Sequence, residues 1–228
     1  MASRASAEIG GRADAAIAIF DLDGTLTRSD TLLPYLAGFL AARPARWTRL
    51  AAVAAALVAY LIGRLDRDAC KERIIRSCLG GASRAELAAY TERFVNRLLD
   101  RGMHRDALAA LEVHRAQGAH LILLSASPDV YVPEIAARMG FQECVCTELS
   151  WSAERLIGAF ATPNRRAEEK SAVVRAIRQR TPGRIAAYAN SSSDLPHLEL
   201  ADQPVLVNGS AAARRAALAR GIPCEPWR

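Results

Sequence analysis

The chain has 228 residues, of which 51% are hydrophobic and 24% are charged, and its formal net charge at pH 7 is +6. This length and composition exclude a disordered polar chain and a small disulfide-stapled domain, and they suit one α/β domain with a smaller insertion. The positive charge favours anionic partners, but the arginines are scattered among few aromatic residues, which argues against nucleic-acid binding.

The first 14 residues are predicted to form a flexible N-terminal tail, because they are mostly small or polar. They contain no apolar central region of the kind that a signal peptide requires. The five cysteines are an odd number spread along the chain, which predicts free thiols in a reducing compartment. We therefore expect a cytoplasmic protein.

The most informative segment is the apolar run 15–20 followed by the string DLDGT at residues 21–25. The run predicts a strand buried on both faces, so Asp21 and Asp23 should lie at its carboxyl end, where open α/β sheets bind ligands. One carboxylate can attack phosphorus while the other exchanges a proton with the leaving oxygen and then with water. Similar strings also occur in solvated turns and calcium-binding loops. Whether this one is catalytic therefore depends on the other segments of the chain.

The interval 32–101 is predicted to be a helical cap inserted between two parts of a core domain, 15–31 and 102–228. Its most hydrophobic run, residues 50–63, is shorter than the about 20 apolar residues of a membrane-spanning helix, which favours a buried cap helix. Tryptophan and arginine residues beside the run also suit a helix that lies in a membrane interface. A peripheral membrane contact through residues 47–64 therefore stays open.

A second apolar run, residues 119–124, ends in the string SASP at residues 125–128. It predicts another buried strand, followed by a helix that starts near Asp129. A serine hydroxyl and nearby backbone N–H groups at such a strand end can bind a phosphoryl oxygen. Ser127, which precedes Pro128, can equally be the N-cap of the following helix.

Lys170 lies near the start of a predicted amphipathic helix that extends to about Gln179. The chain has thirty basic residues, and only Lys71 and Lys170 are lysines. An ammonium group is a compact point charge that the wider guanidinium group cannot replace beside a phosphoryl group. A catalytic lysine and an ordinary surface lysine are both compatible with this pattern.

A further predicted strand, residues 184–188, leads into the string ANSSSDLP at 189–196. A short helix is expected over 195–200, an edge strand over 204–207, and a last helix before Ile222. Strands and helices thus alternate along the core, which predicts an α/β fold with a doubly wound parallel sheet.

In their order, these segments resemble the motifs of the haloacid dehalogenase superfamily, in its phosphoserine-phosphatase-like branch. The resemblance implies a Rossmann-like core and a cap that selects the substrate. It implies that Asp21 is the nucleophile and that Asp23 is the general acid and base. It also implies that Ser125 and Lys170 bind the phosphoryl group.

The resemblance further implies a Mg²⁺ cofactor held by Asp21, the backbone carbonyl of Asp23, and the residues at positions 190 and 194. The family usually has an aspartate at the first of these two positions, where this chain has Asn190, whereas Asp194 matches. An amide oxygen can occupy a magnesium position, but the site loses one negative charge. We therefore expect weaker magnesium binding and slower turnover rather than complete loss of activity.

Asp30 resembles the acid with which phosphoserine phosphatases hold the amino group of their substrate, although it can also cap the following helix. We therefore expect hydrolysis of a small, amino-bearing phosphomonoester such as phosphoserine or histidinol phosphate. One alternative is a membrane-lipid phosphate phosphatase, similar to a phosphatidylglycerophosphatase. A second alternative is a protein that binds a phosphorylated ligand or a partner without catalysis, because Asn190 impairs the metal site. The sequence does not indicate an oligomeric state.

Overall fold

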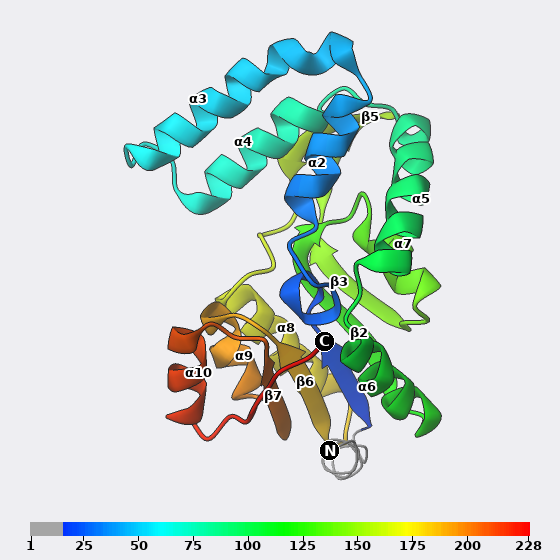
Figure 1. Ribbon diagram of the computed structural model, residues 1–228, viewed down its shortest axis with the longest axis vertical. Coiled ribbons are helices and arrows are strands. Elements are labelled where there is room, and N and C mark those ends of the chain that lie inside the picture. The colour runs from blue at the N-terminus through cyan, green and yellow to red at the C-terminus, as the bar shows by residue number, and fades with distance from the viewer. Residues whose placement is uncertain (1–15) are drawn as a thin grey trace.

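A computed structural model describes residues 16–228, and the predicted tail of residues 1–14 lies outside this range (Figure 1). In the described part, six strands form one sheet with the order β3-β2-β1-β6-β7-β8, and all neighbouring pairs are parallel. The strands are β1 (Ile17–Phe20), β2 (His120–Pro128), β3 (Glu143–Thr147), β6 (Ile185–Ala189), β7 (Gln203–Val207) and β8 (Cys224–Glu225). The predicted α/β fold is confirmed. The prediction that residues 204–207 form an edge strand is wrong, because β8 pairs with β7 on its outer side.

The side chains of β1 alternate between two hydrophobic clusters, one on each face of the sheet. Ile17 and Ile19 belong to one cluster, and Ala18 and Phe20 belong to the other. Because β1 is buried on both faces, its sequence is a continuous apolar run. The first cluster includes side chains of α8 (Glu168–Arg180), α9 (Leu195–Leu198) and α10 (Ala211–Leu218), and the second includes side chains of α6 (Arg105–Ala116) and α7 (Val132–Arg138).

The interval 32–101, predicted as an inserted cap, is helical throughout most of its length. Figure 1 shows its first three long helices standing beyond the carboxyl ends of the sheet strands. A short 3-10 segment, Pro44–Arg49, connects the first two. The long helices are α2 (Leu32–Ala41), α3 (Leu50–Leu61), α4 (Arg67–Leu79) and α5 (Arg84–Arg101).

The interpretation of residues 50–63 as a buried helix is wrong. Within α3 only Ala56 is buried, while nine of the twelve residues are exposed. The helix packs on α4 along one narrow side, where the Cys70 thiol faces the Ala56 carbonyl. The exposure of its other apolar side chains is the largest difference between the sequence-based expectation and the structure.

A hairpin that the sequence analysis did not predict connects the core to the cap. It consists of β4 (Leu149–Ser152) and β5 (Arg155–Phe160), which pair in antiparallel fashion. The Leu156 N–H donates to the Ala82 carbonyl at 2.9 Å, and the Gly81 N–H donates to the Leu156 carbonyl at 2.7 Å. Because these bonds follow α4, the hairpin fixes the end of that helix relative to the core.

Candidate active site

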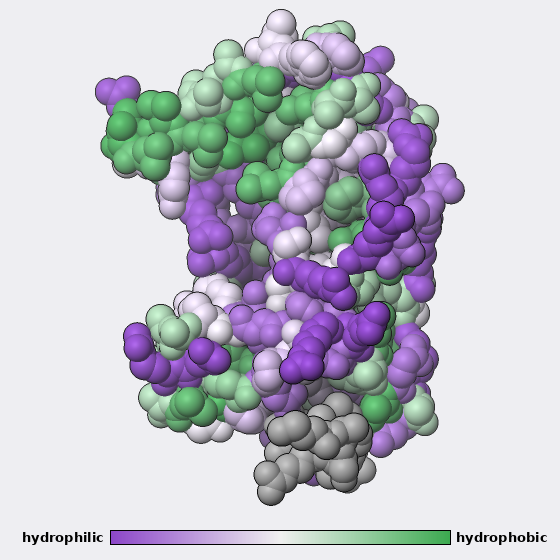
Figure 2. All heavy atoms as spheres, in the orientation of Figure 1, coloured by the Kyte–Doolittle hydropathy of each residue, from purple (hydrophilic) through white to green (hydrophobic). Residues whose placement is uncertain are grey.

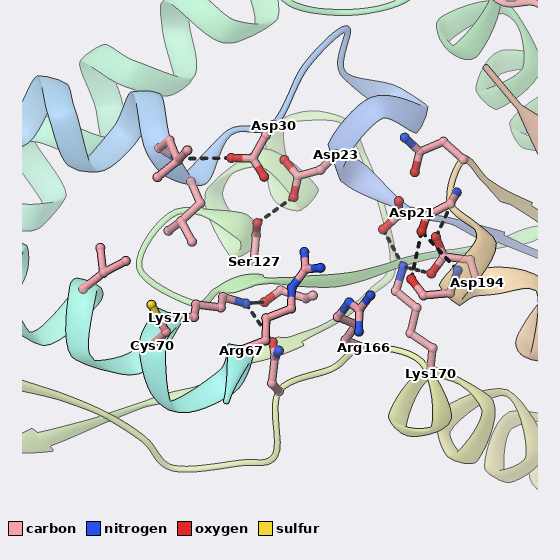
Figure 3. A pocket seen from close by; sticks show the side chains of 18 of the residues that line it. Asp21, Asp23, Asp30, Arg67, Cys70, Lys71, Ser127, Arg166, Lys170 and Asp194 are labelled. Atoms are coloured by element: carbon pink, nitrogen blue, oxygen red, sulfur yellow. Dashed lines mark hydrogen bonds and ion pairs between the residues drawn. The ribbon is translucent and has the colours of Figure 1, made fainter. Parts of the chain in front are cut away.

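A pocket of about 510 Å³ lies between the cap and the carboxyl ends of the central strands. On the core side, the Lys170 ammonium donates to Asp21 Oδ1 at 2.7 Å and to Asp194 Oδ1 at 2.9 Å (Figure 3). Asp21 directly follows β1, Asp194 follows β6, and Lys170 lies in the first turn of α8. All three side chains are buried. The fold therefore brings together three of the predicted site residues.

Burial and ion pairing set the charges of this cluster. Burial raises the pKa of Asp21 to about 7, although Lys170 opposes this shift. Burial by itself would lower the pKa of Lys170, but the carboxylates of Asp21 and Asp194 raise it above its usual value. Burial would also raise the pKa of Asp194, but Lys170 lowers it below its usual value. At neutral pH, Lys170 and Asp194 therefore keep their charges, and Asp21 is the group of this cluster whose pKa burial raises most clearly.

Three hydrogen bonds orient the second carboxylate of the DLDGT string. Asp23 Oδ1 accepts from the backbone N–H of Thr31 at 2.7 Å and from its hydroxyl at 2.6 Å. Asp23 Oδ2 accepts from the Ser127 hydroxyl at 2.6 Å. Burial raises the pKa of Asp23 above its usual value in spite of these bonds. A carboxyl group with a fixed orientation and a raised pKa is suited to give and recover a proton.

The end of β2 contradicts one of the two interpretations of its serines, namely the helix cap. Strand β2 continues to Pro128 and α7 begins only at Val132, so Ser127 does not cap a helix that starts near Asp129. Ser127 lines the pocket and binds Asp23 instead. Ser125 is completely buried, and its hydroxyl oxygen accepts the Ser127 N–H at 3.0 Å. The phosphate-binding role of Ser125 stays a prediction.

Asn190 lines the pocket beside the turn that follows β1. Gly24, in that turn, has a φ of 74°, and a Cβ atom built on it would lie 2.0 Å from Asn190 Nδ2. Glycine therefore serves two purposes here, because it adopts the left-handed conformation and leaves room for the amide. The DLDGT string at 21–25 and the ANSSSDLP string at 189–196 are thus in direct contact.

The cap contributes Lys71, which the sequence analysis noticed as a rare lysine but did not assign to the site. Its ammonium donates to the Ala126 carbonyl at 2.6 Å and to Asn164 Oδ1 at 2.7 Å. The Asn164 amide in turn donates to Asp68 at 2.7 Å. Burial lowers the pKa of Lys71 to about 8, although Asp23 and Asp68 oppose the shift. Lys71 therefore connects α4 with strand β2 and with the loop that contains Asn164.

Asp30 lies both at the start of α2 and at the pocket, and its role toward a substrate amino group stays a prediction. Its carboxylate accepts the Leu33 N–H at 3.1 Å at the start of α2, and the side chain also lines the pocket. Two arginines, Arg67 of the cap and Arg166 of the core, line the same pocket (Figure 3). The opening therefore carries both signs of charge.

Comparisons with known proteins identify the family of this chain. The family model of the haloacid dehalogenase-like hydrolases matches residues 18–199. The chain belongs to this family. Protein CicA of Caulobacter vibrioides is 32% identical over 186 residues, which are 81% of this chain and 82% of that protein.

Solved structures show the same fold as this haloacid dehalogenase-like hydrolase. A protein of unknown function from Bordetella pertussis Tohama I has a TM-score of 0.74 and 26% identity, over 91% of this chain and 96% of its own. A phosphoserine phosphatase, in a form that imitates its phospho-aspartyl intermediate, has a TM-score of 0.64 and 13% identity, over 92% of each chain. The fold is therefore that of the phosphoserine-phosphatase-like branch.

The donor atoms beside Asp21 suit a hard cation, although they are few. Within residues 16–228, no three His, Cys, Asp or Glu side chains form a group that could hold a metal ion. One predicted position carries the amide of Asn190, and the Asp194 carboxylate binds Lys170 and the Ser191 N–H. Asp21 and Asn190, which carry a carboxylate and an amide oxygen, line the pocket here, and the family resemblance adds the main-chain carbonyl of Asp23. Mg²⁺ prefers oxygen ligands of this kind, so the site of this hydrolase fits that ion. The ligands carry one negative charge fewer than a site with an aspartate at position 190 would.

Proposed function

We propose that this haloacid dehalogenase-like hydrolase cleaves phosphomonoesters through a covalent phosphate on Asp21, with Mg²⁺ as cofactor. The observation that carries the proposal is the 2.7 Å contact between Lys170 and Asp21 at the end of β1. A second carboxyl group, Asp23, is oriented separately on the same loop. A nucleophile, a neutralising cation and a proton donor are the parts that transfer of a phosphoryl group to a carboxylate requires.

Each proposed step uses one of these groups. A carboxylate oxygen of Asp21 attacks phosphorus, and the ester P–O bond breaks while the Asp23 carboxyl group gives its proton to the leaving alkoxide. Water then attacks the phosphorus of the aspartyl phosphate and Asp23 takes a proton of that water. The P–O bond to Asp21 breaks, which regenerates the Asp21 carboxylate and releases inorganic phosphate. Lys170 offsets negative charge on Asp21 and the phosphoryl oxygens throughout. Bound Mg²⁺ would neutralise further charge on the phosphoryl oxygens.

The narrower substrate prediction rests on Asp30. Its carboxylate at the opening can attract an amino group, while Lys71 and Arg67 can attract a second anionic group. Phosphoserine, which has an amino group and a carboxylate beside its phosphate, would match both features. Histidinol phosphate, which has the amino group but no second anionic group, would match Asp30 alone. The non-catalytic alternative has less support, because a protein that only binds a ligand has no need of oriented proton and phosphoryl acceptors.

The test is Mg²⁺-dependent phosphate release from a panel of amino-bearing and amino-free phosphomonoesters. We expect activity in the natural chain and a loss of about 1,000-fold or more in Asp21→Asn, because an amide cannot form the covalent intermediate. In Asn190→Asp, half-maximal activity should need about tenfold less Mg²⁺, because the restored carboxylate adds one negative charge to the ligands. Trapping of ³²P on the protein, absent in Asp21→Asn, would identify the intermediate.

Two results would contradict the proposal in different ways. Activity that survives in Asp21→Asn would exclude the covalent route. Activity in Asn190→Asp but none in the natural chain would support the non-catalytic alternative. Circular dichroism of each variant separates a chemical effect from failure to fold.

A further inference from the structure

Helix α3 exposes an apolar surface that no described residue covers. All twelve residues of Leu50–Leu61 are apolar, and nine are exposed. The exposed fractions reach 56% for Val58, 79% for Leu61 and 60% for the adjoining Ile62. Figure 2 shows this surface as the broad green region over the outer end of the cap. A helix that is apolar on all sides is ordinarily buried or in contact with lipid.

The charges around α3 indicate what covers it. Residues 31–65 contain no aspartate or glutamate, and they contain four arginines, at positions 43, 46, 49 and 64. Arg64 is exposed at the end of α3, whereas the other three are half-buried and bind Gly80 or Glu86 of the cap. Trp47 lies just before the helix and Tyr60 lies near its end, and both are exposed. Arginines and amphipathic aromatic rings around an apolar helix are typical of segments that lie in the interface of an anionic membrane.

The shape of the exposed surface favours a lipid interface over a second copy of the chain. At 100° per residue, the exposed positions occupy more than half of the helix circumference, and the remainder faces α4. A protein partner covers the flank that it packs against, whereas an acyl and headgroup layer surrounds a half-immersed helix. No helix within residues 16–228 is long and apolar enough to cross a membrane, which leaves an orientation along the surface.

The apolar surface also continues into the pocket. Leu57 and Tyr60 of α3, together with Leu33 at the start of α2, line the pocket on the cap side. Immersion of α3 would therefore place the pocket opening beside the headgroup layer. We propose that α3, with Trp47 and Ile62, docks this protein on an anionic lipid surface. Docking does not depend on the proposed hydrolysis, because it is measured without substrate.

The experiment is co-sedimentation of the full chain with vesicles of phosphatidylcholine, either alone or with about one third phosphatidylglycerol. The test variant is Val58→Glu/Leu61→Glu, which changes two exposed positions outside the pocket lining. The matched control is Leu108→Glu/Leu218→Glu, which introduces the same charges at exposed leucines of α6 and α10. Circular dichroism of both variants establishes that they are folded.

We expect binding to the anionic vesicles that weakens with salt, and weaker binding to phosphatidylcholine alone. The α3 variant should bind at least about tenfold more weakly than the natural chain, because two apolar side chains no longer enter the interface. The control variant should bind like the natural chain. Equal binding of the α3 variant and the natural chain would overturn the proposal. A natural dimer that becomes a monomer in the α3 variant, without vesicle binding by either, would also overturn it by assigning the surface to a second copy.

Discussion

The only two lysines of the chain contact one pocket from opposite sides, in different electrostatic environments. Lys170, from the core, lies between the carboxylates of Asp21 and Asp194. Lys71, from the cap, binds a main-chain carbonyl and the amide of Asn164. Burial acts to lower the pKa of both, but ion pairs raise that of Lys170 above its usual value, whereas that of Lys71 falls to about 8. The core therefore holds a permanent positive charge, and the cap holds one that a moderate rise in pH removes.

This difference follows from what each part of the molecule contributes. The core carries the groups that would contact phosphorus, and it keeps them in one buried, fully paired cluster. The cap carries groups at the opening, where partial burial makes their charge depend on the surroundings. Substitutions in the core should therefore change the rate of the chemical step, and substitutions in the cap should change substrate binding and its pH dependence.

The largest effect is expected for Lys170→Met, which removes the core cation and keeps an unbranched side chain. The variant leaves the carboxylates of Asp21 and Asp194 buried without their shared partner. Loss of one partner from a buried ion pair lowers the free energy of unfolding by about 3–5 kcal/mol. Because the charge that would offset the developing charge on the phosphoryl oxygens is also lost, we expect kcat/KM of the folded variant to fall by about 100-fold or more. Steady-state kinetics with a soluble phosphomonoester measures the loss.

Lys170→Arg is the matched control, because it keeps the charge but changes its shape. It should retain more activity than Lys170→Met and less than the natural chain, since a guanidinium group is wider than an ammonium group. If Lys170→Met kept more than about a tenth of the natural kcat/KM, the core cation would not be part of the phosphoryl-transfer site.

A smaller effect, with a distinct pH dependence, is expected at Lys71. As the pH rises through about 8, the Lys71 ammonium loses its proton and the opening loses a positive charge. We expect the KM for an anionic substrate to rise severalfold between about pH 7.5 and 9.5, with a smaller change in kcat. In Lys71→Arg the charge persists, so KM should stay level over this range. Equal pH profiles for the two proteins would show that another group titrates.

The same shift has a consequence for stability. The pKa of Lys71 is lower in the folded chain than in the unfolded chain, so between about pH 8 and 10.5 the unfolded chain binds more protons. The contribution of Lys71 to the free energy of unfolding therefore rises with pH across this window, as the cost of burying an ammonium group disappears. Urea unfolding of the natural chain and of Lys71→Met at several pH values isolates this contribution as a difference in slope.

Part of the core site was predictable because it follows from local sequence patterns. Asp21 follows an apolar strand directly, which places it at the carboxyl edge of the sheet. The pattern around Lys170 predicted only a position near the start of a helix, and its place at the site came from the family resemblance. The partners of Lys71 were not predictable, because Asn164 lies 93 residues away and occupies an irregular loop. The only signal for Lys71 was compositional, namely a lysine in a chain that otherwise uses arginine.

Two other features show where sequence patterns fail. The β4–β5 hairpin has Ala153 at a φ of 47°, a conformation that glycine or asparagine would have signalled. The run 50–63 was predicted to be a buried helix from its hydrophobicity and length, while its tryptophan and arginine flanks left a membrane-interface helix open. Hydrophobicity identifies a helix that avoids water but not what covers it. In the structure, α3 packs on α4 along one side only, and the remaining apolar surface requires an explanation from outside the described chain.

The smallest effect is expected for Asp30→Asn, which tests whether the cap opening selects an amino group. An asparagine oxygen can still accept the Leu33 N–H, so the start of α2 and the free energy of unfolding should change by less than about 0.5 kcal/mol. The negative charge is lost, so KM should rise severalfold for phosphoserine and stay unchanged for an amino-free ester of similar size. Equal changes for both esters would mean that Asp30 only caps the helix, and the selectivity of the pocket would then rest on its cations and on the apolar side chains of α3.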